Sequence, residues 1–125
     1  YAPHATLVEG ELVVTVEHCH NCEQAHGMTT QHCSARYLKA ANAMTDVVEQ
    51  ECVRQGKALV RVLLIPAPLE VGKGRLGALE VQATIMRSDG VPHSVVLHSK
   101  LATGRWPSRE IVTQRLRQFL EQFPE

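Results

Sequence analysis

Hydrophobic and polar residues alternate along residues 11–18, ELVVTVEH, near the start of the chain. Leu12, Val14 and Val16 share one face of this run, while Glu17 lies on the other. A period of two is typical of a β-strand with one buried face. We therefore expect the first strand here.

From Ser34 onward the spacing of hydrophobic residues changes to steps of four and three. This period is that of an amphipathic helix with one apolar face. The apolar face consists of Tyr37, Ala41, Met44, Val48 and Cys52, and Leu38 and Val47 are expected to widen it. Gly56 follows where a C-terminal cap is expected, because glycine tolerates the left-handed backbone of that position.

Three further runs have the length and pattern of strands. Residues 58–66, ALVRVLLIP, are almost continuously apolar, which predicts a buried parallel strand. Residues 78–98 alternate on either side of Ser88-Asp89-Gly90, which indicates a β-hairpin. Pro92 predicts that the second hairpin strand begins late or lies at a sheet edge.

The last segment has helical periodicity from Ser108 to the end of the chain. Ser108 is the expected N-cap and Glu110 an acid in the first turn. The apolar stripe consists of Val112, Leu116, Phe119 and Phe123. The predicted order is therefore β-α-β-β-β-α: a single α/β domain over residues 11–125, with a four-stranded mixed sheet and two helices, after an extended lead-in at residues 1–10.

Composition narrows the classes of function. The 125 residues are 44% hydrophobic and 21% charged, with 13 acidic and 13 basic residues giving a formal charge of +0. This balance argues against nucleic acid as the main partner, because phosphate binding needs a net basic face. No apolar run approaches the length of a membrane span, so no spanning helix is expected.

Cysteine and histidine are concentrated between the first strand and the first helix. Three of four cysteines and four of seven histidines fall within residues 18–33. Cys19 and Cys22 are too close together for a loop-stapling disulfide, so a reducing compartment is the better interpretation. We expect the cytoplasm or another reducing compartment, including a mitochondrion after removal of a presequence.

Several stretches together resemble a known family. A CxxC directly after the first strand of a βαβ–ββα order is the layout of a thioredoxin-like fold. VVTVEHCHNC is similar to the strand-plus-CxxC opening of the selenoprotein W, T and H (Rdx) family, and LGALEVQATIMRSDG resembles its middle strand. The closing segment is the more specific match, through Ser99, Lys100, Leu101, Gly104, Trp106 and Pro107.

The resemblance implies a small thiol oxidoreductase that acts through Cys19 and Cys22 on a protein thiol partner. Selenoprotein members carry selenium at the second position, which implicates Cys22 as the attacking thiol; ordinary thioredoxins use the first, here Cys19. The sequence leaves both open. No nucleotide, haem or flavin is implied, but a thiol reductant such as glutathione or thioredoxin would be required for turnover.

The chain departs from the family after Cys22. A thiol attacks as thiolate, which a helix N-terminus stabilises. Here the extra segment at residues 23–33 precedes the helix, unless the helix begins early, at Thr29 or Thr30, with Cys33 in its first turn. The nearby histidines would favour a thiolate if charged, and these are His18, His20, His26 and His32.

Two other hypotheses use the same loop. Cys19, Cys22, Cys33 and His26 have a donor set that could hold a tetrahedral zinc ion, although a second well-spaced ligand pair is absent. Alternatively, the fold is retained as a non-catalytic subunit of a larger protein assembly, with the extra segment as the contact surface.

Other residues with reactive or aromatic side chains receive structural interpretations. Cys52 lies on the apolar helix face, so we expect an inert core thiol. Trp106 precedes Pro107 at a helix entrance, where it is expected to anchor the core. His93 and His98 are expected at the surface or at a strand edge.

Overall fold

Seven elements of regular structure lie in the residues that the computed structural model describes, which are 10–18, 34–57, 60–66, 78–87 and 90–122. In chain order they are β1 (Leu12–His18), α2 (Ser34–Arg54), β2 (Val60–Pro66), β3 (Leu79–Met86), β4 (Pro92–Ser99), α3 (Lys100–Thr103) and α4 (Arg109–Gln122).

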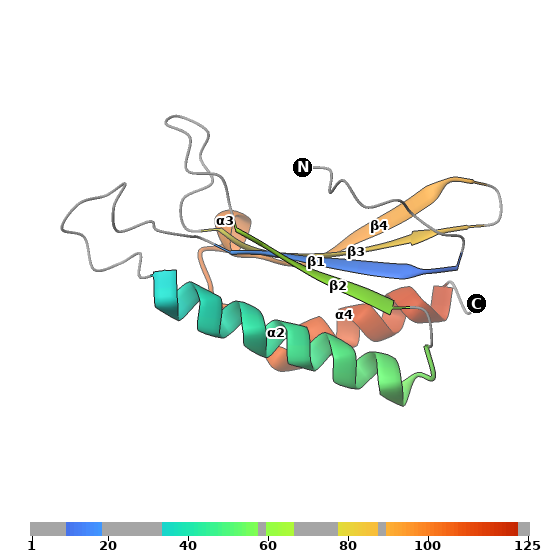
Figure 1. Cartoon of the computed structure of the whole chain (residues 1–125), viewed down its shortest axis with the longest axis horizontal. Coiled ribbons are helices and arrows are strands. Elements are labelled where there is room, and N and C mark those ends of the chain that lie inside the picture. The colour runs from blue at the N-terminus through green and yellow to red at the C-terminus, as the bar shows by residue number, and fades with distance from the viewer. Residues whose placement is uncertain (1–9, 19–33, 58–59, 67–77, 88–89, 123–125) are drawn as a thin grey trace.

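The strands form one sheet in the order β2-β1-β3-β4. β1 is parallel to β2 and antiparallel to β3, and β3 is antiparallel to β4. The two long helices, α2 and α4, cover the same face of this sheet (Figure 1). The predicted α/β fold with a four-stranded mixed sheet is confirmed.

The prediction of two helices is wrong, because the described residues contain a third, the four-residue α3. Its formation depends on caps at both ends. The Ser99 hydroxyl accepts a hydrogen bond from the Ala102 N–H, and Gly104 adopts a φ of 71° while its N–H donates to the Lys100 carbonyl at 2.7 Å. Glycine occupies such a left-handed position without a Cβ clash.

The core lies between the sheet and the two long helices. Leu12, Val14 and Val16 of β1 are fully buried, as the alternation predicts. The α2 stripe from Tyr37 to Cys52 is buried and Val47 widens it as predicted, but the prediction for Leu38 is wrong, because its side chain is 40% exposed. The helix α4 buries Val112, Leu116, Phe119 and Leu120. Leu120 was not part of the predicted stripe, and Phe123 lies outside the described residues.

The capping prediction at Gly56 is confirmed. Gly56 has a φ of 71°, its N–H donates to the Val53 carbonyl at 3.1 Å, and the Lys57 N–H donates to the Cys52 carbonyl at 2.9 Å. These two bonds satisfy carbonyls at the end of α2 that have no partner within the helix. They turn the chain toward β2.

β2 is parallel to β1 as predicted, but the prediction of a buried strand is wrong. It lies at the edge of the sheet, and none of its described side chains is fully buried; Leu64 is 40% exposed. Its apolar content predicted a buried strand, but β3 returns antiparallel beside β1 and leaves β2 outermost.

β4 begins at Pro92 and forms the other edge of the sheet, which is the edge position that Pro92 predicted. The pairing with β3 shifts between Val81 and Gln82, which is a β-bulge. Leu97 and His98 are both buried beside this bulge. His98 was expected at the surface or at an edge; it lies on this edge strand, but its side chain is only 7% exposed and its Nε2 lies 2.9 Å from the Arg105 carbonyl oxygen.

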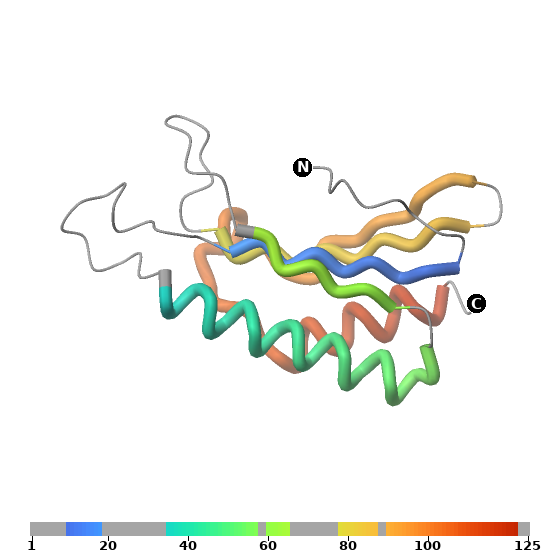
Figure 2. Tube along the Cα trace, in the orientation of Figure 1, coloured from blue at the N-terminus to red at the C-terminus, as the bar shows by residue number. Residues whose placement is uncertain are grey.

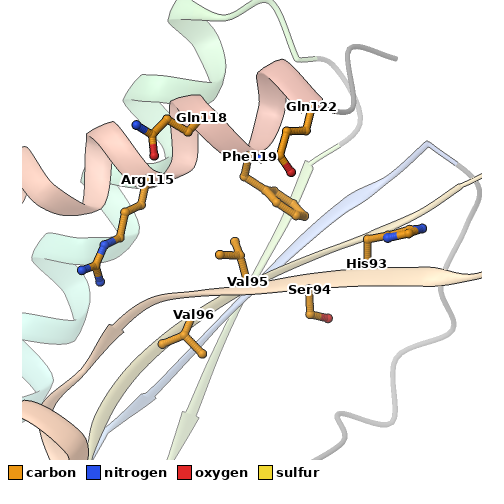
Figure 3. A pocket seen from close by; sticks show the side chains of 8 residues that line it. All are labelled: His93, Ser94, Val95, Val96, Arg115, Gln118, Phe119 and Gln122. Carbon is orange, nitrogen blue, oxygen red and sulfur yellow. The ribbon is translucent and has the colours of Figure 1, made fainter.

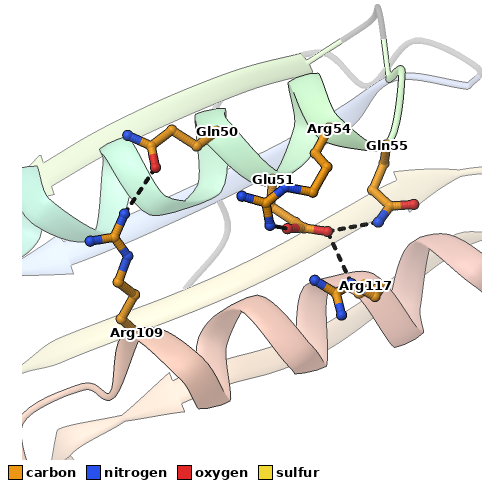
Figure 4. Close-up of polar contacts among 6 residues, drawn as sticks. All are labelled: Gln50, Glu51, Arg54, Gln55, Arg109 and Arg117. Carbon is orange, nitrogen blue, oxygen red and sulfur yellow. Dashed lines mark hydrogen bonds and ion pairs between the residues drawn. The ribbon is translucent and has the colours of Figure 1, made fainter.

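A buried carboxylate joins α2 to α4 (Figure 4). The side chain of Glu51 is only 1% exposed, and it accepts hydrogen bonds from Arg54 and Gln55 at 2.7 Å and from Arg117 of α4 at 3.2 Å. Burial raises the pKa of Glu51, but the hydrogen bonds from Gln55 and Arg117 and the two arginine charges more than offset this and lower the pKa below its ordinary value.

Candidate functional site

The candidate site lies at one end of the sheet. The carboxyl ends of β1 and β2, the start of α2 and the short α3 all lie at this end (Figure 2). Of the predicted site residues, His18 is described. The others, Cys19, Cys22, His20, His26, His32 and Cys33, lie outside the described residues, as does any earlier start of the helix at Thr29 or Thr30.

The end of β1, which precedes Cys19 in the sequence, is buried. Glu17 is 5% exposed and His18 is 6% exposed, which is unusual burial for polar side chains. His18 is paired with Leu79 of β3, and Glu17 with Glu80. β1 is therefore paired and buried up to its last residue, His18.

Glu80 links this part of the sheet to α3. Its carboxylate accepts hydrogen bonds from the Ser99 hydroxyl, from the Lys100 N–H at 2.8 Å and from the Leu101 N–H at 3.2 Å. A carboxylate is favoured at a helix N-terminus, where N–H groups have no partner in the helix. Glu80 therefore fixes the position of Lys100.

Trp106 connects α2, α3 and the approach to α4. Its ring centroid lies 4.8 Å from that of the buried Tyr37, at an interplanar angle of 45°. It is half-buried and packs against the core, which confirms its interpretation as a core anchor. The guanidinium carbon of Arg36 lies 4.8 Å from the ring centroid and the Lys100 Nζ lies 5.0 Å from it. Both distances are within the range of a cation–π interaction.

The start of α2 is consequently electropositive. The first turn of α2 contains no acidic residue, while Arg36 lies within it and Lys100 is held nearby through the same aromatic ring. The partial positive charge of the helix N-terminus adds to these two cations. An anion at this end of the fold, such as a thiolate, would be stabilised, although Glu17 and Glu80 partly oppose the effect.

Two side chains at this end were not identified from the sequence, Arg36 and Glu80. The signal for Arg36 was its place in the first helical turn directly after a cysteine-rich loop. For Glu80 the signal was weaker, because its proximity to Glu17 follows from the strand register. A run of alternating residues does not encode that register.

The zinc hypothesis is not resolved by the described residues. Among them, no three histidine, cysteine, aspartate or glutamate side chains gather as a metal site requires. The four proposed ligands, Cys19, Cys22, His26 and Cys33, all lie elsewhere in the chain.

Two hollows lie on the surface of the sheet. One of about 370 Å³ lies between β4 and α4 (Figure 3). Arg115, which lines it, donates to the Leu97 carbonyl at 3.1 Å. Another of about 200 Å³ is lined by Glu17 and Glu80 together with Thr15 and Val96. The second hollow is also lined by Ser99, whose hydroxyl donates a hydrogen bond to the Glu80 carboxylate.

Cys52 is a free, buried thiol, as predicted. Burial, followed by the negative charge of Glu51, raises its pKa from 9.0 to about 11. Since only the thiolate is nucleophilic, about 100-fold less of it is present at pH 8 than for an ordinary cysteine. We expect iodoacetamide to alkylate Cys52 at least 100-fold more slowly in the native protein than in urea, measured by mass spectrometry of peptides. Equal rates would contradict this assignment.

The described residues form a small α/β domain with two cationic side chains, Arg36 and Lys100, beside the start of α2. No family model, no curated protein and no solved structure matches the chain. No helix in the described parts of the chain is long and apolar enough to cross a membrane.

Proposed function

We propose that the protein is a thiol–disulfide redox protein that uses Cys19 and Cys22, as in the Rdx family that its sequence resembles. One thiolate attacks a disulfide of a partner protein and forms a mixed disulfide, and the second thiol then displaces the partner. The pair loses two electrons and two protons as its S–S bond forms, and the partner disulfide is reduced to two thiols. Glutathione or thioredoxin, in a reducing compartment, restores the dithiol.

The observation that carries this proposal is the electropositive start of α2. The CxxC follows the buried end of β1, and the chain re-enters the fold at a helix with Arg36 in its first turn. Lys100 lies on the same aromatic cluster. These charges and the helix dipole would favour a thiolate in the loop between β1 and α2.

Single serine substitutions test the two-cysteine mechanism and identify the nucleophile. We expect Cys19→Ser and Cys22→Ser each to abolish catalytic turnover in a disulfide-reduction assay. The variant that retains the nucleophile should accumulate a mixed disulfide with the partner. The buried Cys52 supplies the control, since Cys52→Ala should retain activity. Full activity in either serine variant would contradict the mechanism.

A second candidate is a non-catalytic subunit of a protein assembly. It is favoured by the eleven residues between Cys22 and the first residue of α2, Ser34, which separate the CxxC from the helix start. In that case, serine at both Cys19 and Cys22 would leave partner binding unchanged, whereas deletion of residues 24–32 would remove it. Zinc held by the loop would be detected by metal analysis of protein purified without chelator.

A further inference from the structure

The two edges of the sheet differ in chemistry. β4 begins with a proline, contains a bulge and carries serine and histidine side chains. These features discourage pairing with another strand. β2 has a regular register over all seven residues, and its sequence, VRVLLIP, has one charge and one terminal proline. Within the described part of the chain it pairs with β1 alone.

The flank of α2 beside β2 is also accessible, and a large apolar side chain lies toward each end of it. Val53 is 80% exposed and Leu38 is 40% exposed. A hollow of about 360 Å³ separates α2 from the β2 edge, lined by residues that include Thr45, Val60 and Val62. The flank consists of Leu38, Asn42, Thr45, Glu49 and Val53, spaced at steps of four and three.

We propose that this β2–α2 edge is the interface of a symmetric homodimer, in which β2 pairs antiparallel with β2 of a second copy. An exposed apolar edge strand offers unpaired backbone groups as a template for another strand. The two sheets would then form one continuous sheet. This proposal rests on described residues alone and is independent of the chemistry of Cys19 and Cys22.

The α2 flank is self-complementary under the two-fold axis of such a dimer. Antiparallel packing about the middle of α2 places Leu38 opposite Val53 of the second copy. The same packing places Asn42 opposite Glu49 of the second copy, and an asparagine amide can donate a hydrogen bond to a carboxylate. The exposed Lys39 lies one helical turn from Asn42, so its positive charge comes close to that same carboxylate. A C2 interface requires such self-complementarity.

The same two-fold axis relates both α2 and β2 to their counterparts in the second copy. Thr45, near the middle of α2, lines the same hollow as Val62, which adjoins the central residue of β2, Leu63. The 21-residue helix is about 31 Å long, and a helix packed on a sheet is about 20 Å deep. Their product gives an edge surface of about 600 Å², without the added area of protruding side chains. This approaches the roughly 800 Å² per partner of a standard interface.

Light scattering after size-exclusion chromatography tests the proposal on the full chain. We expect a mass twice the 13.8 kDa of the chain, falling on dilution to that of one chain. Leu64→Lys in β2 and Val53→Lys on α2 should each give monomers. Val96→Lys, at a 53% exposed position of β4, is the matched control and should leave the dimer intact.

If the Leu64→Lys protein does not fold, Val53→Lys still tests the interface. The Val53 side chain is largely in solvent, so its replacement is not expected to prevent folding. A wild-type mass of one chain at concentrations up to about 1 mM, where even a binding free energy near 4 kcal/mol would be visible, would overturn the proposal. That result would leave the edge to a strand of another protein. A dimer that persists in Val53→Lys, or that Val96→Lys disrupts, would also overturn it.

Discussion

Replacing Glu51 with alanine is expected to lower the free energy of unfolding by about 2–3 kcal/mol at neutral pH, because it removes the carboxylate from a buried ion-pair network. Arg117 of α4 and Arg54 of α2 would lose their shared partner. Both arginines are partly exposed, so water would recover some of the loss, and the estimate lies below the range for fully buried pairs.

The effect of Glu51→Ala should depend on pH in a defined direction. The pKa of Glu51 is lowered in the folded protein, so its contribution is complete above its ordinary value of 4.5 and is lost as the pH falls through the folded-state pKa. Urea denaturation at pH 7 and at successively lower pH measures this. Glu121→Ala, at an exposed position of α4, should change stability by less than about 0.5 kcal/mol at either pH. An equally small effect of Glu51→Ala would contradict the role of the network.

Replacing Trp106 with alanine is expected to lower the free energy of unfolding by about 3 kcal/mol, at the lower end of the range for aromatic truncations because the ring is half-buried. The substitution removes the contact with Tyr37 and releases both Arg36 and Lys100 from the ring. The electropositive start of α2 would lose its fixed geometry as well.

Trp106→Phe is the control, since it retains an aromatic ring against Tyr37 and should be less destabilising than alanine. Denaturation followed by far-ultraviolet circular dichroism suits both variants, because Trp106 is the chain's one tryptophan and its fluorescence would be lost. A loss below about 1 kcal/mol for Trp106→Ala would mean that the ring does not anchor the core.

Periodicity predicted the elements of the fold well, because burial on one face imposes a repeat that the sequence must satisfy. The steps of four and three in α2 predicted the buried positions Tyr37, Ala41, Met44, Val48 and Cys52, whereas Leu38, expected beside them, is exposed. Strand order leaves no such repeat. The apolar run of β2 therefore predicted a buried strand, whereas pairing between β1 and β3 places β2 at the edge. The proposed dimer would account for this mismatch, because β2 would then be covered.

Local irregularities were the other source of error. The bulge between β3 and β4 places the His98 side chain in the interior. A pattern of alternating polar and apolar residues does not show where a strand carries an extra residue. The four residues of α3 are too few to show a period, and their caps at Ser99 and Gly104 carried the available signal. For the candidate site, the sequence located the CxxC between a strand and a helix; the cations beside Trp106 depend on contacts between distant segments.

The central claim, that Cys19 and Cys22 form a working dithiol, is tested most directly by mapping disulfides in metal-free protein equilibrated with glutathione buffers of graded redox potential. The account predicts a Cys19–Cys22 disulfide that forms and is reduced reversibly as the potential changes, while the buried Cys52 stays a thiol throughout. Cys19 and Cys22 that remain thiols at every potential would contradict it, and the function would then be sought in the contacts of residues 23–33.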